Sequence, residues 1–478
     1  MKFLLVILII CSGQVFAQEV FQVHEVEKAA EPAGGITFLN QFINANLQIP
    51  IKSAAKGMNA RVFVKGVIEI DGSMSRLEVI RSVDSLIDQE ALRVLGLYKA
   101  WKPALIKEKP VRQVSVFPVI FRTAPIPEFD STENALIEYF DKNHTSVSDP
   151  NKYRFRNMIP VDERGFVRAD ISYQELVSGK WKTLKNIPYQ KTEFWAPYVG
   201  PPGQDSIKAF KIFAKTDNWD NAYEEVILQA DGKLLSHRTY PGSGRPPSSG
   251  KFYFITGVLQ ESQQTNDGLV KTTDWYDNGQ IRSVLELGGG KGTIVKNVWE
   301  RDGTQIVKDG NGWAKIKGNS YRGKIVFEEG QVVEGNRSGK WLGKFADSTV
   351  VYEEFYNAGK LEKGQSNFGK QHVTYDTGDI SQPQFKGGLN KMYQFLGENI
   401  SYPRDASASK ITGRVVVSFV VQEDGTLNDY LIEQSVMKSL DNEALRVIKK
   451  MSGLWEPATQ KGEKIRVRYK LPINFDTN

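Results

Sequence analysis

The sequence GRVVVSFVVQEDGTLNDYLIEQ, residues 413–434, has the pattern of a β-hairpin. Its first part, Gly413 to Val421, is dominated by β-branched residues, which favour extended backbone. Asp424-Gly425 follows as a tight-turn signal, and Leu427 to Gln434 resumes the strand pattern. The stretch therefore predicts two antiparallel strands joined by a short turn.

Helical patterns lie on both sides of this hairpin. Residues 389–399 carry apolar side chains at helical spacing, and Tyr402-Pro403 follows where proline cannot continue a helix. Residues 441–450 form a second amphipathic pattern, with Asp441 placed to cap its start. The chain then alternates between apolar and basic residues, as in a strand with one buried and one solvated face. The apolar set is Ile465, Val467, Tyr469 and Leu471, and the basic set is Lys464, Arg466, Arg468 and Lys470.

The same pattern occurs a second time near the N-terminus. Glu90-Ala91-Leu92-Arg93 matches Glu443-Ala444-Leu445-Arg446 at an offset of 353 residues (443 − 90), and the offset is 354 from Trp101 onward (455 − 101). The expected elements of this copy are helices at 37–47 and 86–97 and strands at 61–70, 77–82 and 111–121. The order helix, strand, strand, helix, strand predicts a three-stranded antiparallel sheet with both helices on one face.

The residues between the two copies are different in character. Residues 134–142 are a candidate for a short amphipathic helix, and strands with glycine turns are expected from Asn151 onward. An aromatic or apolar strand end, a polar-glycine turn and a return strand recur at 228–234, 275–281, 299–306 and 355–361. Single hairpins are marginally stable, so stacking of these hairpins is expected. The predicted fold class is α+β, with two small terminal domains flanking a β-rich repeat region.

The repeated end segments resemble the TonB C-terminal domain. In the second copy the resemblance rests on Tyr402-Pro403, Asp424-Gly425, Trp455-x-Pro457 and Leu471-Pro472-Ile473. The first copy has the matching Asp71-Gly72 and Trp101-x-Pro103 but departs at Ile49-Pro50, which lacks the tyrosine, and at Phe117-Pro118-Val119. The middle is similar to MORN-type repeats and to the repeats of bacterial YwqK proteins. The expected domains are residues 31–123, 126–375 and 381–478.

The resemblance implies a periplasmic domain that pairs with a short extended segment of an outer-membrane, TonB-dependent transporter. A small antiparallel sheet leaves an unpaired edge, which can accept such a segment as an added strand. The expected partner-binding residues are Ile465, Arg466, Val467, Arg468, Tyr469, Lys470 and Leu471 in the second copy, and Val111, Arg112, Val114 and Val116 in the first. The two end domains could also pair with each other in a homodimer.

The N-terminus has the pattern of a secretory signal. Lys2 precedes an apolar run, and Ala17 is a small residue at the expected cleavage point, so residues 1–17 are predicted to be a signal peptide. The alternative is a retained membrane anchor, for which the apolar stretch is short. Cys11 is the only cysteine and lies inside this segment, which excludes disulfides and thiol catalysis in the processed chain. Export to the periplasm of a Gram-negative envelope is expected.

Enzymatic chemistry has little support in the sequence. The four histidines, His24, His144, His237 and His372, are not at metal-ligand spacing with one another. Asp88, Glu90, Asp441 and Glu443 fall at helix starts, where carboxylates act as caps. No cofactor, metal or catalytic residue is therefore predicted, and with a net charge of +6 and no dense basic stripe, no nucleic-acid partner. Three hypotheses remain: a periplasmic peptide-binding scaffold, an anchored energy transducer, and an enzyme hidden in the middle region.

Overall fold

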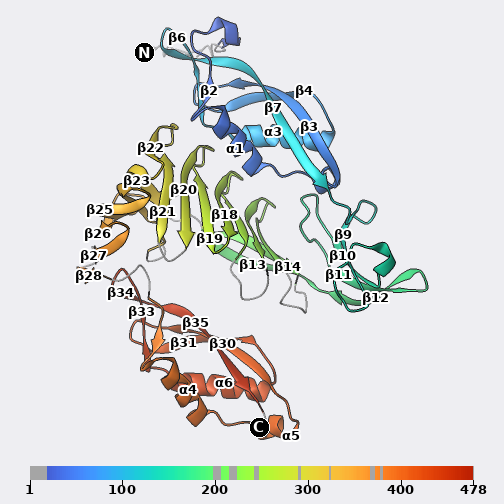
Figure 1. Ribbon diagram of the computed structural model, residues 1–478, viewed down its shortest axis with the longest axis vertical. Coiled ribbons are helices and arrows are strands. Elements are labelled where there is room, and N and C mark those ends of the chain that lie inside the picture. Colours follow the sequence, from blue (N-terminus) through green and yellow to red (C-terminus); the bar gives the residue numbers. More distant parts are fainter. Residues whose placement is uncertain are drawn as a thin grey trace, which may run out of the picture. The chain divides into compact units, whose positions relative to one another are not determined.

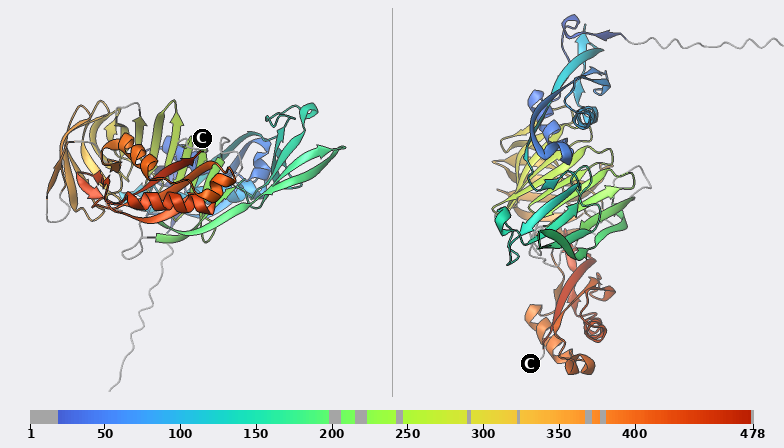
Figure 2. Two further views of the ribbon diagram at one scale, coloured as in Figure 1. Left: turned by 90° about the horizontal axis from the view of Figure 1, so that it is seen from below. Right: turned by 90° about the vertical axis from the view of Figure 1, so that its right-hand side faces the viewer.

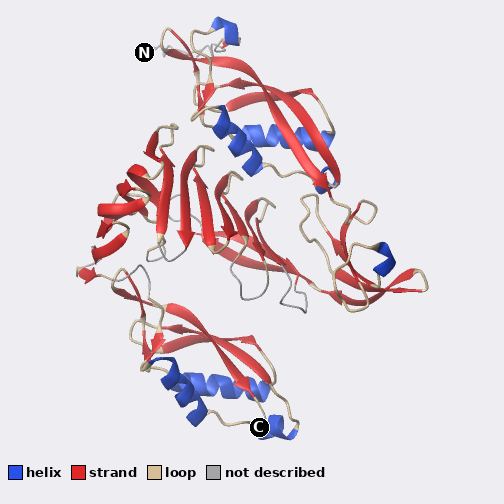
Figure 3. Ribbon diagram, viewed as in Figure 1, coloured by secondary structure: helices blue, strands red, loops and turns tan. Residues whose placement is uncertain are grey.

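The computed structural model describes residues 19–197, 206–214, 223–241, 247–288, 292–321, 324–366, 372–376 and 381–476. The predicted signal peptide lies outside these residues. The chain divides into two compact units, residues 1–308 and 309–478, and each is described by itself. Helices are concentrated toward the two ends of the chain, and the middle is built of strands (Figures 1 and 3).

The N-terminal lobe, which extends from Val20 to Pro125 and includes the predicted domain 31–123, has two main helices packed on one face of an antiparallel sheet (Figure 1). Buried side chains of both helices share one core with alternate residues of β3 and β7, which places the helices on the same face. A fourth strand, β1, pairs in parallel with β7 and extends the predicted sheet to the order β1-β7-β3-β4. The elements are β1 (Val20–Phe21), β2 (Glu31–Pro32), α1 (Ile36–Asn46), α2 (Ile51–Ala54), β3 (Lys56–Ile68), β4 (Met74–Arg81), α3 (Ser85–Leu97), β5 (Trp101–Lys102), β6 (Ala104–Ile106) and β7 (Lys109–Pro125), with a 3-10 turn at Val23–Glu25.

The C-terminal lobe, residues 381–476, has the predicted three antiparallel strands, in the order β31-β30-β35. Buried side chains of α4 and α6 share one core with β30 and β35, so both helices lie on one face of this sheet (Figure 1; Figure 2 gives two further views). The last strand begins later than expected, because Ile465 belongs to a separate short hairpin and Arg466 lies between the two. The elements are β29 (Gln384–Phe385), α4 (Gly388–Asn399), α5 (Arg404–Ala408), β30 (Gly413–Val421), β31 (Leu427–Gln434), α6 (Lys438–Lys450), β32 (Trp455–Glu456), β33 (Ala458–Gln460), β34 (Glu463–Ile465) and β35 (Val467–Phe475).

The predicted capping role of Asp441 is wrong. Helix α6 begins three residues earlier, after Met437, which makes no side-chain cap. The Asp441 carboxylate reaches backward instead and accepts hydrogen bonds from Ser435 Oγ at 2.5 Å and Val436 N at 3.2 Å. Asp88 makes the same two contacts in the N-terminal lobe, where Asp84 is the cap residue. Both aspartates therefore tie the preceding loop to the first turn of the helix.

The expected helix at 134–142 is also wrong, since this stretch contains strand β9. Ala135 and Ile137 are buried alternately, and β9 pairs with a strand on each side. Cross-strand pairing here overrides the weak helical pattern. The strand is part of a five-stranded sheet in the order β12-β11-β10-β9-β8. Its elements are β8 (Phe129–Asp130), β9 (Ala135–Phe140), β10 (Phe155–Pro160), β11 (Ile171–Val177) and β12 (Lys180–Ile187), with a 3-10 turn at Pro150–Lys152.

The predicted hairpins from residue 228 onward are confirmed as turns between consecutive antiparallel strands. Each of the four recurring stretches ends one strand, turns through a polar-glycine step and starts the next. Within each unit, neighbouring hairpins are joined side by side by ladder hydrogen bonds. The strands in the first unit are β13 (Tyr189–Pro197), β14 (Ser206–Ala214), β15 (Tyr223–Gln229), β16 (Leu234–Tyr240), β17 (Ser249–Tyr253), β18 (Leu259–Asn266), β19 (Leu269–Trp275), β20 (Ile281–Gly288), β21 (Thr293–Trp299) and β22 (Gln305–Lys308); those in the second are β23 (Asn311–Lys317), β24 (Phe327–Val333), β25 (Asn336–Lys344), β26 (Val350–Asn357), β27 (Lys360–Ser366) and β28 (Val373–Tyr375).

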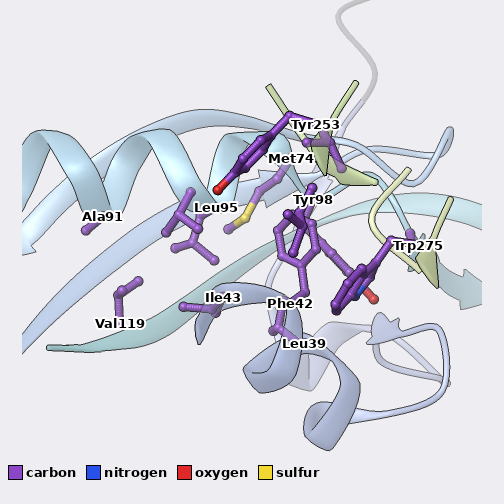
Figure 4. Close-up of a cluster of buried hydrophobic side chains, with 14 of the residues drawn as sticks. Leu39, Phe42, Ile43, Met74, Ala91, Leu95, Tyr98, Val119, Tyr253 and Trp275 are labelled. Carbon is purple, nitrogen blue, oxygen red and sulfur yellow. The ribbon is translucent and has the colours of Figure 1, made fainter. Parts of the chain in front are cut away.

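In the first unit, the N-terminal lobe shares its core with the turns of these hairpins (Figure 4). Phe42 of α1 packs on Tyr98, with ring centroids 5.0 Å apart. Gly279, at φ +91°, lies so close that a Cβ there would be 2.7 Å from Phe42 and 2.9 Å from Tyr98. Asn46 Oδ1 accepts a hydrogen bond of 2.8 Å from the backbone N–H of Leu259. Apolar packing and a buried hydrogen bond thus hold the lobe on the hairpin turns.

In the second unit, the turn between β33 and β34 carries Lys461 into a buried acidic cluster. Lys461 is 3% exposed, and its Nζ lies 2.7 Å from the carboxylate of Glu354, which is 1% exposed. Arg337 binds the neighbouring Glu328 at 2.5 Å. Burial alone would raise the pKa of Glu328, but the Arg337 charge and hydrogen bond lower it to about 2. These ion pairs satisfy charges that would otherwise be very costly to bury.

Candidate peptide-binding edge

The outer edge of β35 is open in the part of the chain that the structure describes. β35 pairs with β30 through nine residue pairs, from Val421 opposite Val467 to Gly413 opposite Phe475. The other side of β30 is taken by β31, so β35 ends the sheet. A strand in this position offers unpaired backbone N–H and C=O groups to an extended peptide.

Pro472 indicates which residues present those groups. Proline has no N–H and is tolerated in a sheet where its nitrogen faces away from the ladder. Pro472 lies opposite Val416, and the ladder continues on both sides of it without a shift in register. The backbone N–H groups of successive residues in a strand point to alternate sides. The N–H groups of Arg468 and Lys470 therefore point to the open edge, as the nitrogen of Pro472 does.

The side chains of β35 alternate as the sequence predicted. Tyr469 packs inward on Trp455 and Phe419, at centroid distances of 5.0 and 5.9 Å, and Leu471 is buried. Arg468 and Lys470 are on the opposite, solvated face. Arg468 is paired with Asp429, and Lys470 lies 3.3 Å from Glu433. Of the predicted residues, Val467, Arg468, Tyr469, Lys470 and Leu471 therefore lie together on one open strand.

Arg466, just before β35, differs from its counterpart in the N-terminal lobe. Arg112 is held by Glu69, which directly follows β3, with Nε 2.6 Å from the carboxylate. Hydrogen bonds from Arg112 lower the pKa of Glu69 below its ordinary value. The position equivalent to Glu69 in the C-terminal lobe is Gln422, whose side chain donates to Asn428. Arg466 is exposed and has no ion-pair partner among the described residues.

The corresponding edge of the N-terminal lobe is partly occupied, which corrects the predicted free edge there. Arg112 and Gln113 pair in parallel with Val20 and Phe21 of β1. Val111 pairs with Ala104 of the short strand β6. Beyond this point, Val114 and Val116 pair with β3 on one side, and no described strand covers the other side. The covering strand lies outside the repeated module, so the repeat does not predict it.

The motif residues lie in the interior of each lobe and away from the edge. Trp101 and Trp455 are buried in short strands that pair with the segment leading into the first helix. Gly72, at φ +81°, and Gly425, at φ +83°, pack against the carbonyl oxygens of these tryptophans. The Asp-Gly turn and the tryptophan are therefore one structural unit. Pro103 and Pro457 directly follow the short strands, and Pro403 is the N-cap residue of α5.

Tyr402 also has a structural role. Its hydroxyl donates to the carbonyl oxygen of Ile411, and its ring lies edge-on to Phe475 at 5.9 Å. Tyr402 thus fastens the loop after α4 to the far end of the last strand. The N-terminal lobe has Ile49 before its proline and lacks this bond.

Sequence reasoning missed a network that is repeated in both lobes. Glu90 accepts a hydrogen bond of 2.6 Å from Gln48 N, and Glu443 accepts one of 2.6 Å from Ser401 N. Arg93 and Arg446 bind these glutamates and the carbonyl oxygen at the end of the first helix. The Glu-x-x-Arg spacing was visible in both copies, but its target in the loop is set only by the tertiary fold. Hydrogen bonds from Arg446 lower the pKa of Glu443 below its ordinary value.

Among the residues that the structure describes, no helix is both long and apolar enough to span a membrane. The same residues contain no group of three or more His, Cys, Asp or Glu side chains arranged to hold a metal ion.

Comparison with known proteins identifies the two lobes. The family described as "Gram-negative bacterial TonB protein C-terminal" matches residues 45–123 and 398–477. Two solution NMR structures of the Helicobacter pylori TonB C-terminal domain are similar in sequence. The structure of residues 179–285 has 28% sequence identity, and the match covers 19% of this chain and 80% of that one, with a TM-score of 0.16. The structure of residues 194–285 has 29% sequence identity, and the match covers 18% of this chain and 91% of that one, with a TM-score of 0.16. No curated protein matches the chain. The chain therefore carries two copies of the TonB C-terminal domain, one at each end of the β-rich middle.

Proposed function

We propose that this chain is a non-enzymatic binding protein of the Gram-negative cell envelope. Its C-terminal lobe would bind an extended peptide segment as an additional strand along β35. The observation that carries the proposal is the open edge of β35, which has no strand partner among the described residues on its outer side. Strand addition supplies affinity through backbone hydrogen bonds and specificity through alternate side chains.

The charge of the edge favours a segment that carries a carboxylate. Arg466 is exposed and has no ion-pair partner among the described residues, and it lies directly before the open strand. Arg468 and Lys470 are already paired with acidic residues of β31, so their charges are largely compensated. The family match supports segments of TonB-dependent outer-membrane transporters as the ligands, in the periplasm.

The middle region would act as a scaffold. Its hairpins share a core with the N-terminal lobe in the first unit and enclose Lys461 of the C-terminal lobe in the second. Such contacts suit a role in holding each lobe on a rigid support. The proposed scaffold role includes the similarity of these hairpins to MORN and YwqK repeats.

The test uses the full chain and fluorescent peptides that copy the periplasmic N-terminal segments of TonB-dependent transporters. Lys470→Pro removes one outward N–H from the edge, and Lys470→Ala is the control that removes only the charge. We expect Lys470→Ala to bind within about 3-fold of the unaltered chain and Lys470→Pro to bind at least 10-fold more weakly, as for the loss of a hydrogen bond to an ordered strand. Equal affinities of the two folded variants would refute binding at this edge.

A further inference from the structure

In both lobes the segment before the first helix is paired in the same way, back to Lys28 in the N-terminal lobe and Ser381 in the C-terminal lobe. Lys28 and Leu105 exchange backbone hydrogen bonds of 3.2 and 2.8 Å in the N-terminal lobe. At the equivalent positions of the C-terminal lobe, Ser381 N donates to Thr459 O at 2.8 Å. The segment that leads into the first helix therefore follows one path in both copies.

Upstream of these residues the two paths differ. In the N-terminal lobe the chain comes from the β7 edge, where Val20 and Phe21 form β1. At the offset of 353 residues, Val20 corresponds to Val373, which begins β28 and pairs with β27 of the hairpin region. The C-terminal edge is open because its upstream segment is hydrogen-bonded in another sheet.

We infer that the β7 edge is a second peptide-binding site, closed in cis by residues 19–23 of the same chain. The inference rests on the proposed function, since it assigns the same kind of ligand to the equivalent edge. The bound segment is an observed example of strand addition at this position of the module, running parallel to β7 with Val20 opposite Arg112. The ligand class is an extended segment with an apolar pair, as in Val20-Phe21.

The closing segment is weakly held compared with the chain that follows it. β1 has two ladder pairs, its residues are half-buried, and Val23 is 60% exposed. Anchoring begins later, where Glu27 accepts from Lys107 N at 2.9 Å and Ala30 N donates to Gln113 Oε1 at 2.9 Å. Segments with few buried contacts open at low free-energy cost. Residues 19–23 can therefore leave the edge while residues from Glu27 onward stay in place.

The test uses a fluorescent synthetic peptide, EVFQVHEVE, which copies residues 19–27. All proteins carry Lys470→Pro, which weakens binding at the C-terminal site. Val20→Gly with Phe21→Gly is the release variant. Val20→Cys with Arg112→Cys, in a Cys11→Ser background, locks the segment when oxidised, and its reduced form is the matched control.

We expect the release variant to bind the peptide at least 10-fold more tightly than the parent, and the oxidised lock to bind at least 10-fold more weakly than its reduced form. Equal affinity of the release variant and the parent, with both folded, would overturn the inference. The proposed function is tested by a different measurement. It is refuted if Lys470→Pro alone leaves the affinity of the chain for the transporter peptides unchanged.

Discussion

The N-terminal and C-terminal lobes have one fold but different surroundings. In the N-terminal lobe, Phe38 of α1 packs edge-on against Trp299 at 5.1 Å, and the next turn of the helix faces the hairpins. The residue equivalent to Phe38 in the C-terminal lobe is Lys391, which is exposed. That lobe is instead held by Lys461 in its buried acidic cluster. The same module is thus attached to the strands through a helix in one copy and through a turn in the other.

The way in which each lobe is attached to the hairpin strands decides which of its surfaces remains available for binding. The first helix of the C-terminal lobe carries the exposed Lys391 where its counterpart carries Phe38, so the contact with Trp299 has no equivalent there. Its β35 edge is open, whereas the β7 edge is partly covered by β1. A repeated sequence therefore does not imply two equivalent binding sites, and paired substitutions at equivalent positions can separate the roles.

The largest difference is expected between Lys461→Ala and Lys107→Ala. These lysines occupy equivalent positions, but Lys107 is exposed and Lys461 is 3% exposed. Loss of Lys461 leaves Glu354 without its nearest cation, and breaking a buried pair costs about 3–5 kcal/mol. Lys107→Ala should change stability by less than about 0.5 kcal/mol. Urea unfolding of the full chain measures both, and equal shifts would show that the buried pair does not stabilise the second unit.

Phe42→Ala and Phe395→Ala compare the two first helices. Phe42 is fully buried against Tyr98 and the Gly279 turn, and its removal should cost about 3–4 kcal/mol through lost burial and a cavity. Phe395 is only partly buried, so the same change should cost about 1–2 kcal/mol. Thermal unfolding followed by circular dichroism tests this. A larger loss for Phe395→Ala would contradict the difference in packing.

Gly425→Ala tests the turn that packs on the motif tryptophan. A Cβ at Gly425 would lie 2.2 Å from the carbonyl oxygen of Trp455, in addition to the strain of φ +83°. The expected loss is about 2–3 kcal/mol. Gly232→Ala is the control, since φ is +84° there and nothing lies within 4 Å, and should cost about 1 kcal/mol. Equal losses in unfolding measurements would mean that the contact with Trp455 contributes nothing.

Gln422→Glu would copy the Arg112–Glu69 pair into the C-terminal lobe. The new carboxylate should pair with Arg466 and weaken peptide binding by about 3- to 5-fold, since exposed charge pairs contribute up to about 1 kcal/mol. Gln422→Ala, which adds no charge, should leave the affinity nearly unchanged. Anisotropy titrations at low and high salt check this, because the difference should shrink with ionic strength. A persistent difference at high salt would point to a structural effect.

The smallest effect concerns pH. The pKa of Glu69 is lowered in the folded protein by hydrogen bonds from Arg112, so this pair contributes stability above the unfolded pKa. That contribution is lost as pH falls through the lowered pKa of the folded state. Glu69→Gln should therefore destabilise the chain slightly at pH 7 and reduce the further loss on acidification. The check is the unfolding midpoint of the unaltered chain and of Glu69→Gln between pH 7 and pH 3. Gln422→Ala, at the equivalent uncharged position of the C-terminal lobe, is the control.

Much of each lobe could be predicted from local pattern. The hairpin at 413–434 and the amphipathic helices appeared as expected because their periodicity agrees with the side that is buried in the lobe. The expected helix at 134–142 failed because its pattern is short, and pairing on both edges decided its conformation. Residues of β35 were predicted as an edge because their alternation is regular.

The repeat, the two lobes and the hairpin turns follow from the amino-acid sequence alone, since these depend on spacing, glycine positions and alternation within short stretches. Three contacts depend on the folded chain: Val20 and Phe21 cover one edge, Val373 pairs within the hairpin region, and Lys461 is buried beside Glu354. Some of these contacts join residues that are far apart in the sequence. The others depend on the choice of a short segment between two strands with which it could pair. Their free energies come from burial and ladder hydrogen bonds, which no local pattern specifies.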